Sequence, residues 1–480
     1  MQTRPLLPKY LKRYMIDLNT IRHIYFIGIG GIGMSALARY FLFQGKKVSG
    51  YDRTQSTLTL QMEKEGISIH YTDDPGLAPK EAELVIYTPA IPADHLELGW
   101  YRQHNYPVVK RSDALGAITQ HTFNICVAGT HGKTTTSAMT AHILRHSGYG
   151  CNAFLGGIAA NYNSNFWSSE RAVCVVEADE YDRSFLKLSP DIAVITAMDA
   201  DHLDIYGTER SMQDSFIEFS GRIKPEGTLF VKAGLSRSDE FRAGKKTTYH
   251  FSDDTADIYA KNLKTVNGHY RFDAVVKGER IDGLTLNMGG AHNVENALAS
   301  IGIARLLNID AGLIREAVAA FKGVKRRFEY LVKTDKLAYI DDYAHHPEEL
   351  NTLISSAKAL FGEMRCTVIF QPHLYSRTRD LAEQFAESLD KADEVILLPI
   401  YPARELPIEG VSSEMIASRM KNRQCRVLDK NELLDDLGRS AAQPGKGRLI
   451  ITAGAGDIDR LTDPIRTLLN AKQPMRLEEK

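Results

Sequence analysis

The residue types with the clearest chemical role lie at 127–136, which read Val-Ala-Gly-Thr-His-Gly-Lys-Thr-Thr-Thr. Apolar residues alternate over 123–127 and predict a strand, and 137–145 has the pattern of an amphipathic helix. Glycines let backbone N–H groups converge on an anion, and a helix N-terminus attracts negative charge. The stretch therefore predicts a nucleotide phosphate site, in which Lys133 reaches the terminal phosphates and Thr134 ligates Mg²⁺.

This loop departs from the full P-loop pattern at one position. The pattern has a glycine five residues before Gly132, where this chain has Val127. The departure describes a shorter loop, Gly-Thr-x-Gly-Lys-Thr, and a glycine-rich turn before an ordinary helix is the alternative interpretation.

A second glycine-rich turn, Gly-Ile-Gly-Gly-Ile-Gly at 28–33, lies between an apolar run at 24–27 and a helical pattern at 34–43. A further strand at 47–51 ends in Asp52, at the distance at which dinucleotide-binding folds place their ribose acid. The motif predicts a diphosphate at a helix N-terminus, which NAD, FAD or a UDP-sugar would supply. A tight turn without a ligand is the alternative.

Acidic residues and a histidine follow two later strands. The apolar run at 172–176 ends in Glu177, and the strand at 192–196 leads to His202. Ligands of open α/β sheets bind at the carboxyl ends of strands, so Glu177 is the expected second Mg²⁺ contact. The acids at 179–180 fit a solvated turn. For His202, a second cation site, substrate orientation and a structural role all stay open.

Between these motifs, short alternating segments at 227–283 predict β-hairpins. The helix that follows opens with His292 and Asn293, and Asn296 lies one turn further on. This spacing is typical of residues that contact a bound ligand, although helix capping alone would explain Asn293.

The last third of the chain repeats strand-then-helix units, which predict another Rossmann-like sheet. Its strands are expected at 337–340, 367–370, 395–399 and 448–452. Polar clusters rich in histidine and arginine follow the first two of these strands, and 453–456 follows the last with two glycines. One face of this region therefore has the composition expected of residues that line an active site.

The bulk numbers exclude several classes of protein. With 59 basic and 60 acidic residues the net charge is −1, which favours neither nucleic acid nor a membrane surface as partner. The five cysteines are scattered without a CxxC motif, as in a protein of the reducing cytoplasm. No apolar run reaches membrane-spanning length. A chain of 480 residues is expected to form several domains, and it is predicted to act as a monomer or homodimer.

Two phosphate-binding turns and a third region with arginine and histidine suit an enzyme with several substrates. The economical chemistry is an ATP-dependent ligation, in which ATP phosphorylates a bound carboxylate and an amine attacks the acyl phosphate. Lys133 and Mg²⁺ would neutralise charge on the transferring phosphoryl group, and arginines would stabilise the oxyanion.

At this point the sequence resembles the Mur ligases of peptidoglycan synthesis over essentially its whole length. The motifs that carry the resemblance are 28–38, 129–136, Glu177-Ala-Asp-Glu180, Asp201-His202, His292-Asn293, Arg326-Arg327-Phe328, Asp342-Tyr-Ala-His-His-Pro347 and 370–379. The implied fold is α/β, with an N-terminal Rossmann-like UDP-binding domain at 1–119, a central P-loop-type mononucleotide-binding domain at 120–325 and a C-terminal Rossmann-like domain at 326–480.

The resemblance also implies the substrates and the residues that bind them. The substrates are ATP, L-alanine and the lactyl carboxylate of UDP-N-acetylmuramic acid, and the metal is Mg²⁺ with Mn²⁺ as the alternative. The implied ATP-binding residues are Gly129, Thr130, His131, Gly132, Lys133, Thr134, Thr135, His292, Asn293, Asn296, Arg327 and Asp342. Those for the UDP-sugar are Gly28, Gly30, Gly31, Gly33, Asp52 and His70, and those for the amino acid are Tyr343, His345 and Arg377. The implied metal ligands are Thr134, Glu177 and His202, and the implied catalytic residues are Lys133, Glu177, His202 and Arg377.

Two sequence details bear on the branch of the family. Ala344 stands where the alanine-adding motif usually has glycine, and its methyl group is expected to narrow the pocket. No lysine lies between Lys187 and Lys224, whereas the ligases that add later residues carry a modified lysine in this region. The alternatives are a murein peptide ligase that attaches a tripeptide, an NAD-dependent oxidoreductase built on 28–33, and a nucleotide-gated binding protein.

Overall fold

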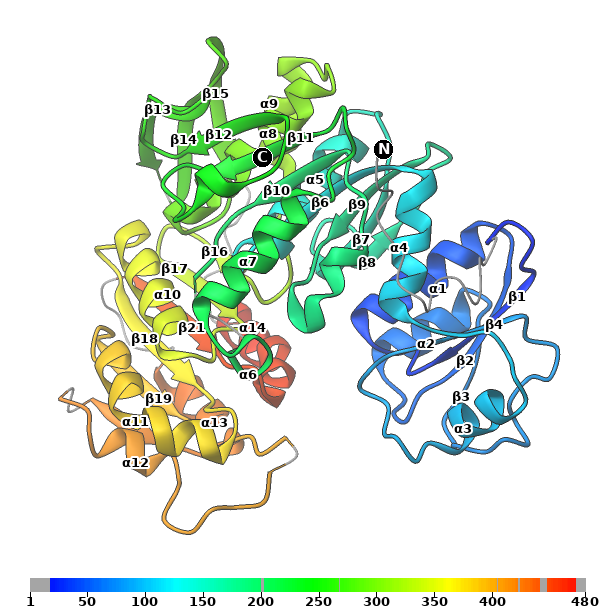
Figure 1. The fold of residues 1–480 in the computed structure, drawn as a ribbon. Coiled ribbons are helices and arrows are strands. Elements are labelled where there is room, and N and C mark those ends of the chain that lie inside the picture. Colours follow the sequence, from blue (N-terminus) through cyan, green and yellow to red (C-terminus); the bar gives the residue numbers. More distant parts are fainter. Residues whose placement is uncertain are drawn as a thin grey trace, which may run out of the picture. The chain divides into compact units, whose positions relative to one another are not determined.

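The computed structural model describes residues 18–199, 203–266, 268–403, 405–421, 424–440 and 447–471. Figure 1 shows the helices and strands coloured along the sequence. The chain divides into two compact units. Unit 1 comprises Met1–Tyr259, Val275–Glu279 and Asn296–Ala317, and unit 2 comprises Ala260–Ala274, Arg280–Glu295 and Val318–Lys480. Among the described residues, no helix is long and apolar enough to cross a membrane.

The first sheet of unit 1 has five parallel strands in the order β3-β2-β1-β4-β5. All five residues of β1 are buried, as expected for the central strand of a parallel sheet. The strands are β1 (His23–Ile27), β2 (Lys47–Tyr51), β3 (Ser68–His70), β4 (Leu84–Tyr87) and β5 (Val108–Lys110). The helices are α1 (Ile32–Phe43), α2 (Thr57–Lys64), α3 (Leu96–Gln103) and α4 (Arg111–His121). The glycine-rich turn lies between β1 and α1, as predicted.

The second sheet of unit 1 has the strand order β12-β11-β10-β6-β9-β7-β8. Neighbouring strands of this sheet pair in parallel except for β7 with β8. The strands are β6 (Phe123–Ala128), β7 (Asn152–Ala159), β8 (Ser164–Trp167), β9 (Val173–Glu177), β10 (Ile192–Ile195), β11 (Thr228–Lys232) and β12 (Lys245–His250). The helices are α5 (Lys133–His146), α6 (Leu203–Tyr206), α7 (Glu209–Ser220), α8 (Ala291–Leu306) and α9 (Ala311–Ala320), and short 3₁₀ helices cover Tyr181–Lys187 and Ser238–Glu240. The central position of β6 places the second glycine loop in the middle of the sheet edge.

The prediction of hairpins over 227–283 is only partly correct. Strands β11 and β12 pair in parallel with their neighbours and so extend the central sheet. Strand β13 (Ile258–Val266) begins beside β12, where Tyr249 pairs with Ile258. Strands β14 (His269–Val276) and β15 (Glu279–Leu286) do form a hairpin-like pair, because only Lys277 and Gly278 join them and both have positive φ.

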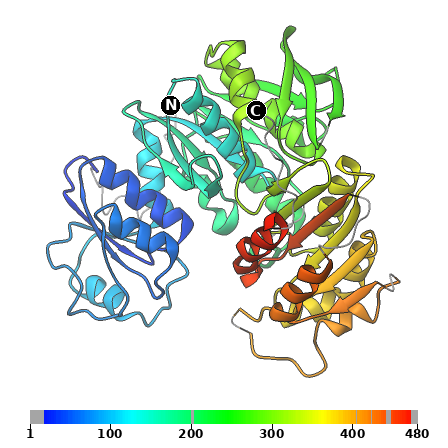
Figure 2. The same ribbon diagram turned by 180° about the vertical axis from the view of Figure 1, so that it is seen from behind.

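The sheet of unit 2 has the order β16-β17-β21-β18-β19-β20, parallel except for β16. The strands are β16 (Glu329–Lys333), β17 (Leu337–Asp342), β18 (Arg365–Phe370), β19 (Glu394–Leu397), β20 (Cys425–Val427) and β21 (Arg448–Ala453). The helices are α10 (Pro347–Leu360), α11 (Tyr375–Leu389), α12 (Glu414–Ala417), α13 (Lys430–Ser440), α14 (Thr462–Ala471) and the 3₁₀ helix Asp457–Leu461. Apolar residues of α13 and α14 pack on one face of this sheet, as the orange and red helices of Figure 2 show. The predicted Rossmann-like pattern is therefore present.

Candidate active site

The glycine loop after β6 has a backbone that only glycine accepts readily. Gly129 has φ +135°, and a Cβ built on it would lie 2.1 Å from Thr196 Oγ1. Gly132 has φ +80° and is the N-cap residue of α5. Thr196 donates from its hydroxyl to the Ala128 carbonyl at 3.1 Å and also to the His131 carbonyl. The loop is thus pinned at the carboxyl ends of β6 and β10, with the N-terminus of α5 facing outward for an anion.

Lys133, the first residue of α5, is held inside the loop by two oxygens. Its Nζ donates to the Gly129 carbonyl at 2.6 Å and to Glu180 Oε1 at 2.7 Å. Glu180 is fully buried, and this burial raises the pKa of its carboxyl although Lys133 opposes the shift. The interpretation of 179–180 as a solvated turn is therefore wrong for Glu180, whose carboxylate holds the ammonium group of Lys133 in place.

Thr134 and Glu177 lie together beside this lysine. The Thr134 hydroxyl donates to Glu177 Oε1 at 2.9 Å, and the Gly156 amide donates to Glu177 Oε2 at 2.8 Å. Burial raises the pKa of Glu177 in spite of the nearby Lys133 charge. A hydroxyl and a carboxylate are hard oxygen ligands of the kind that Mg²⁺ prefers, and such sites keep several waters or phosphate oxygens. The pair therefore fits a divalent cation shared with a nucleotide phosphate.

The other predicted nucleotide-binding residues of unit 1 surround the same loop. Thr130 is anchored, since its hydroxyl accepts from the Asp199 amide at 3.2 Å and its own amide donates to the Ala197 carbonyl at 3.1 Å. His131 is exposed, and Thr135 is buried on the first turn of α5. Asn296 of α8 lies against the loop, because a Cβ on Gly132 would be 2.8 Å from its Oδ1. His202 lies outside the described residues.

His292 and Asn293 belong to unit 2, at the start of α8. The Asn293 amide side chain donates to the Gly289 carbonyl at 2.6 Å, and its backbone amide donates to Gly290. Asn293 is buried and His292 is exposed. Asn293 therefore stabilises the turn that starts the helix, and His292 is the more accessible of the two.

The glycine loop after β1 is organised by Asp52 at the end of β2. The Gly28 amide, with φ +82° at that residue, donates to the Tyr51 carbonyl at 2.8 Å. The Gly30 amide donates to Asp52 Oδ2 at 2.7 Å, and the Thr54 amide donates to Oδ1 at 3.1 Å. Asp52 thus shapes the loop directly, in addition to the ribose contact that its position predicts.

The rest of this loop leads into α1. Gly31 is the N-cap residue of the helix, and its carbonyl accepts from the Ser35 amide at 2.9 Å. Gly33 lies against Arg111 of α4, since a Cβ on it would be 2.7 Å from an Arg111 guanidinium nitrogen. Arg111 is a cation beside the predicted diphosphate site, and the sequence analysis missed it because 78 positions separate it from Gly33.

In unit 2, Asp342 ends β17 and holds the following turn. Its two carboxylate oxygens accept from the Phe328 amide at 2.6 Å and the Ala344 amide at 2.8 Å. Burial raises the pKa of Asp342 to about 6. Arg327 lies 6.0 Å from the centre of the Tyr343 ring. The structure therefore groups Arg327, Asp342 and Tyr343 at one strand end.

His345 and Arg377 belong to the same part of unit 2. The His345 ring lies 5.1 Å from that of Tyr343 and 6.0 Å from that of His373. Burial lowers the pKa of His345, and the charge of Arg377 adds to this effect. The Arg377 Nη1 atom is buried and has no hydrogen-bond partner among the described residues. A buried guanidinium nitrogen without a partner favours recognition of an anion such as a carboxylate.

Comparisons with known proteins identify the family of the chain. Family models match in three places: "Mur ligase family, catalytic domain" at residues 23–122, "Mur ligase middle domain" at 127–304 and "Mur ligase, glutamate ligase domain" at 326–456.

Curated relatives match almost end to end. UDP-N-acetylmuramate–L-alanine ligases from Flavobacterium johnsoniae and Parabacteroides distasonis are each 47% identical to this chain, covering 95% of it and 99% and 98% of their own lengths. Among solved structures, the UDP-N-acetylmuramate-alanine ligase of Thermotoga maritima is 29% identical, has a TM-score of 0.77, and covers 94% of this chain and 100% of its own. A murein peptide ligase from Psychrobacter arcticus, at 22% identity and a TM-score of 0.65, shows the shared fold.

Proposed function

This chain belongs to the Mur ligase family, and from that premise we propose that it joins L-alanine to UDP-N-acetylmuramic acid with ATP. The observation that carries the proposal is the 47% identity to ligases of that name over 95% of the chain. The reaction is an ATP-dependent ligation in the synthesis of peptidoglycan precursors. The Lys133–Thr134–Glu177 cluster supplies the phosphate chemistry that such a reaction needs.

We propose that the loop at 129–135 binds the phosphates of ATP. Lys133 would exchange its contacts with Gly129 and Glu180 for phosphate oxygens, and it would stabilise the charge that develops as the γ-phosphoryl group is transferred. Thr134 and Glu177 would hold the divalent cation, which we propose to be Mg²⁺ with Mn²⁺ as the alternative, because both metals accept hard oxygen ligands of this kind. When bound, that cation neutralises phosphate charge.

Further nucleotide contacts are proposed around the loop and in unit 2. Asn296 lies against Gly132 and is proposed to face the nucleotide, as are His292 and Asn293. Arg327 and Asp342 are proposed as nucleotide contacts of unit 2, and His202 as a second cation ligand.

For the UDP-sugar, we propose binding of the diphosphate at 28–33, where backbone amides and the N-terminus of α1 meet. Asp52 follows β2, and His70 is the last residue of the adjacent strand β3; both are proposed to lie along the nucleoside. The lactyl carboxylate is the group that accepts the γ-phosphoryl group, which gives an acyl phosphate and ADP.

For the amino acid, we propose that Arg377 binds the carboxylate, with Tyr343 and His345 beside it. The amine then attacks the carbonyl carbon of the acyl phosphate, the C–O bond to phosphate breaks, and inorganic phosphate leaves. Ala344 is buried next to these residues, so its methyl group is expected to favour small amino acids.

The three domains are proposed to have the boundaries 1–119, 120–325 and 326–480. The three separate sheets and the three family models support this division. The cytoplasmic location and the monomeric or homodimeric state stay predictions from the sequence.

The test is a phosphate-release assay with UDP-N-acetylmuramic acid, ATP and Mg²⁺, comparing L-alanine, glycine, L-serine and a murein tripeptide. We expect L-alanine to give the highest kcat/KM. Turnover with the tripeptide alone would assign the chain to the murein peptide ligases instead. Reduction of a nicotinamide cofactor without ATP would overturn the ligase assignment.

A further inference from the structure

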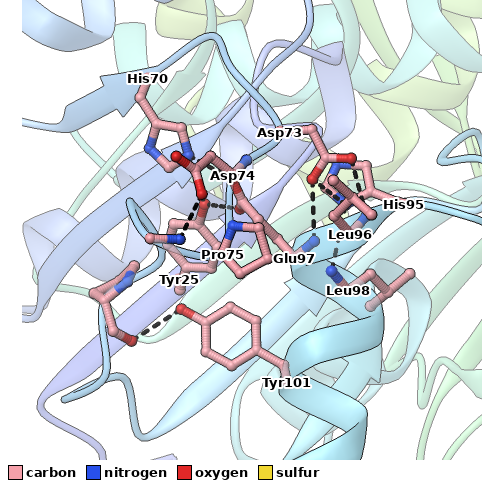
Figure 3. A network of polar contacts seen from close by, with 12 residues as sticks. Tyr25, His70, Asp73, Asp74, Pro75, His95, Leu96, Glu97, Leu98 and Tyr101 are labelled. Atoms are coloured by element: carbon pink, nitrogen blue, oxygen red, sulfur yellow. Dashed lines mark hydrogen bonds and ion pairs between the residues drawn. The ribbon is translucent and has the colours of Figure 1, made fainter.

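A buried carboxylate lies beneath the first sheet and collects three hydrogen bonds. Glu97 of α3 is fully buried, and Figure 3 shows Tyr25 of β1 and His70 of β3 converging on it. His70 Nε2 lies 2.7 Å from Glu97 Oε1, to which the Asp74 amide also donates at 3.2 Å. The Tyr25 hydroxyl donates to Glu97 Oε2. The network therefore joins elements that are far apart in the sequence.

These contacts determine which nitrogen of His70 carries its hydrogen. The Asp74 amide can only donate, and burial together with Glu97 raises the pKa of Tyr25, so the phenol also stays a donor. Because both of these neighbours donate, the Glu97 oxygens act as acceptors, and His70 Nε2 is the donor in the third contact. A neutral imidazole has one N–H group, so Nδ1 keeps a lone pair and is an acceptor.

Glu97 is held at its backbone as well as at its carboxylate. Asp73 accepts from the Leu96 amide at 2.9 Å and from the Glu97 amide at 3.0 Å, and it lies 3.2 Å from His95 Nδ1 (Figure 3). The start of α3 is thus fixed by a carboxylate at its N-terminus. A rigid Glu97 leaves the His70 ring little freedom to turn.

His70 lies where a nucleoside on the first glycine loop would extend. Its carbonyl accepts from the Asp52 amide at 3.1 Å, and Tyr51 pairs with it in the sheet. A diphosphate at the loop after β1 directs its nucleoside across the carboxyl ends of β2 and β3. The His70 side chain keeps 22% of its surface exposed, and its Nδ1 has no hydrogen-bond partner among the described residues.

We propose that Glu97 is a positioning residue which presents His70 Nδ1 as an acceptor, so that the site selects uracil over cytosine. Uracil carries a hydrogen on N3, whereas cytosine has a lone pair there. With cytosine, two acceptors would face each other and both would lose their hydrogen bonds to water. The inference rests on the proposed function, because it concerns the base of the UDP-sugar.

The test compares UDP and CDP binding to the full chain by titration calorimetry. The wild-type protein is expected to bind UDP at least about tenfold more tightly than CDP. Glu97→Gln replaces one acceptor oxygen by an NH₂ group that can donate to His70 Nε2, and the preference should fall below about threefold. His70→Phe keeps an aromatic ring without either nitrogen, and it should weaken UDP but not CDP.

Equal binding of UDP and CDP by the wild-type protein would overturn the inference, and so would an equal loss of both nucleotides in Glu97→Gln. Should Glu97→Gln fail to fold, the His70→Phe result decides alone, since that side chain is partly exposed. Lys80→Ala is a control, because Lys80 stacks on Trp100 of α3 and donates to the Pro75 carbonyl but has no hydrogen bond to His70 or Glu97. It should leave the UDP to CDP ratio unchanged.

A spectroscopic readout separates positioning from a merely structural role. In ¹⁵N-histidine-labelled protein above pH 8, the His70 signals, identified by their loss in His70→Phe, should report the Nε2–H tautomer. An Nδ1–H tautomer in the wild-type protein would overturn the inference. If the chain forms product and yet does not discriminate UDP from CDP, only the inference fails. If it binds neither nucleotide, the proposed function fails as well.

Discussion

The two glycine loops of unit 1 have the same architecture but differ in the charged side chains that contact them. Each follows a central parallel strand and opens a helix, α1 in one case and α5 in the other. The loop at 28–33 is shaped by a carboxylate, Asp52, which accepts from a loop amide. The loop at 129–133 contains an ammonium group, Lys133, held by Glu180 and beside Glu177. The shared geometry can bind phosphate in both places, but only the second loop has charges suited to moving a phosphoryl group.

The comparison predicts that a substitution in the second loop can abolish phosphate release while the first loop still binds UDP. Lys133→Ala should lower the rate of phosphate release by about 10²- to 10³-fold or more, because transition-state charge loses its cation. UDP binding, measured by calorimetry, should stay within about twofold, since the two loops lie on different sheets.

The matched control for that variant is Lys224→Ala. Lys224 also forms a partly buried ion pair, at 2.8 Å to Asp191, but lies away from the loop. It should lower thermal stability and leave turnover near the wild-type rate. Loss of UDP binding in Lys133→Ala would show that the two loops depend on each other.

The second prediction concerns Glu177, the carboxylate that we propose as a cation ligand beside the second loop. Glu177→Gln should raise the Mg²⁺ concentration for half-maximal activity by about 10- to 100-fold, measured in a Mg²⁺ titration. Asp179→Asn is the control, because Asp179 accepts from the Tyr181 amide in its own turn. An unchanged Mg²⁺ requirement in Glu177→Gln would remove Glu177 from the proposed metal site.

The same residue predicts how activity depends on pH. Burial raises the pKa of Glu177, and the protonated carboxyl cannot ligate a cation. At limiting Mg²⁺, activity should therefore fall on the acid side at a pH above the usual carboxylate range. A higher Mg²⁺ concentration should move this acid-side fall in activity to lower pH, because the cation competes with the proton for the carboxylate. A fall that does not respond to Mg²⁺ would contradict this assignment.

A substitution in the first loop should change KM for the UDP-sugar rather than kcat. Gly28→Ala forces an alanine to φ +82° and places its Cβ 2.6 Å from Thr88 Cγ2. We expect the loop to relax out of this strained conformation in the free enzyme. Binding of the UDP-sugar must then restore about 1–2 kcal/mol of backbone strain, so its KM should rise roughly 5- to 30-fold with kcat nearly unchanged. Gly45→Ala shares a positive φ of +74° but meets no atom within 4 Å, and its KM should equal that of the wild type. A matching fall in kcat would show that the first loop also takes part in the chemistry.

The sequence was sufficient to predict those parts of both loops whose structure depends on residues adjacent in the chain. Glycine spacing and the apolar runs before it predicted β1, β6 and the helices that follow, because strand, turn and helix signals are local. The parallel pairing of β11 and β12 was missed, since a short alternating segment does not reveal which strand it joins.

The contacts that set each loop's electrostatics could not be predicted from the sequence. Lys133 and Glu180 are 47 positions apart, and Glu180 lay in an acidic run that pattern alone describes as solvated. His70 and Glu97 are 27 positions apart and meet because the tertiary fold brings the start of α3 to the end of β3. In both cases the tertiary fold determines which residues pair, and the residue types indicate only which side chains could form a pair.

The smallest expected effect lies in the carboxylate that shapes the first loop. Asp52→Asn keeps an acceptor oxygen for the Gly30 amide but removes the charge, so the loop should persist with a weaker hydrogen bond. We expect KM for the UDP-sugar to rise by about 3-fold and KM for ATP to stay unchanged, measured in the phosphate-release assay. Asp310→Asn is the control, because Asp310 accepts from the Gly312 amide at the same 2.7 Å on an exposed turn. A large change in KM for ATP would contradict the separation of the two loops, whereas a loss of UDP binding beyond about 100-fold would mean that the ribose contact proposed for Asp52 depends on its charge.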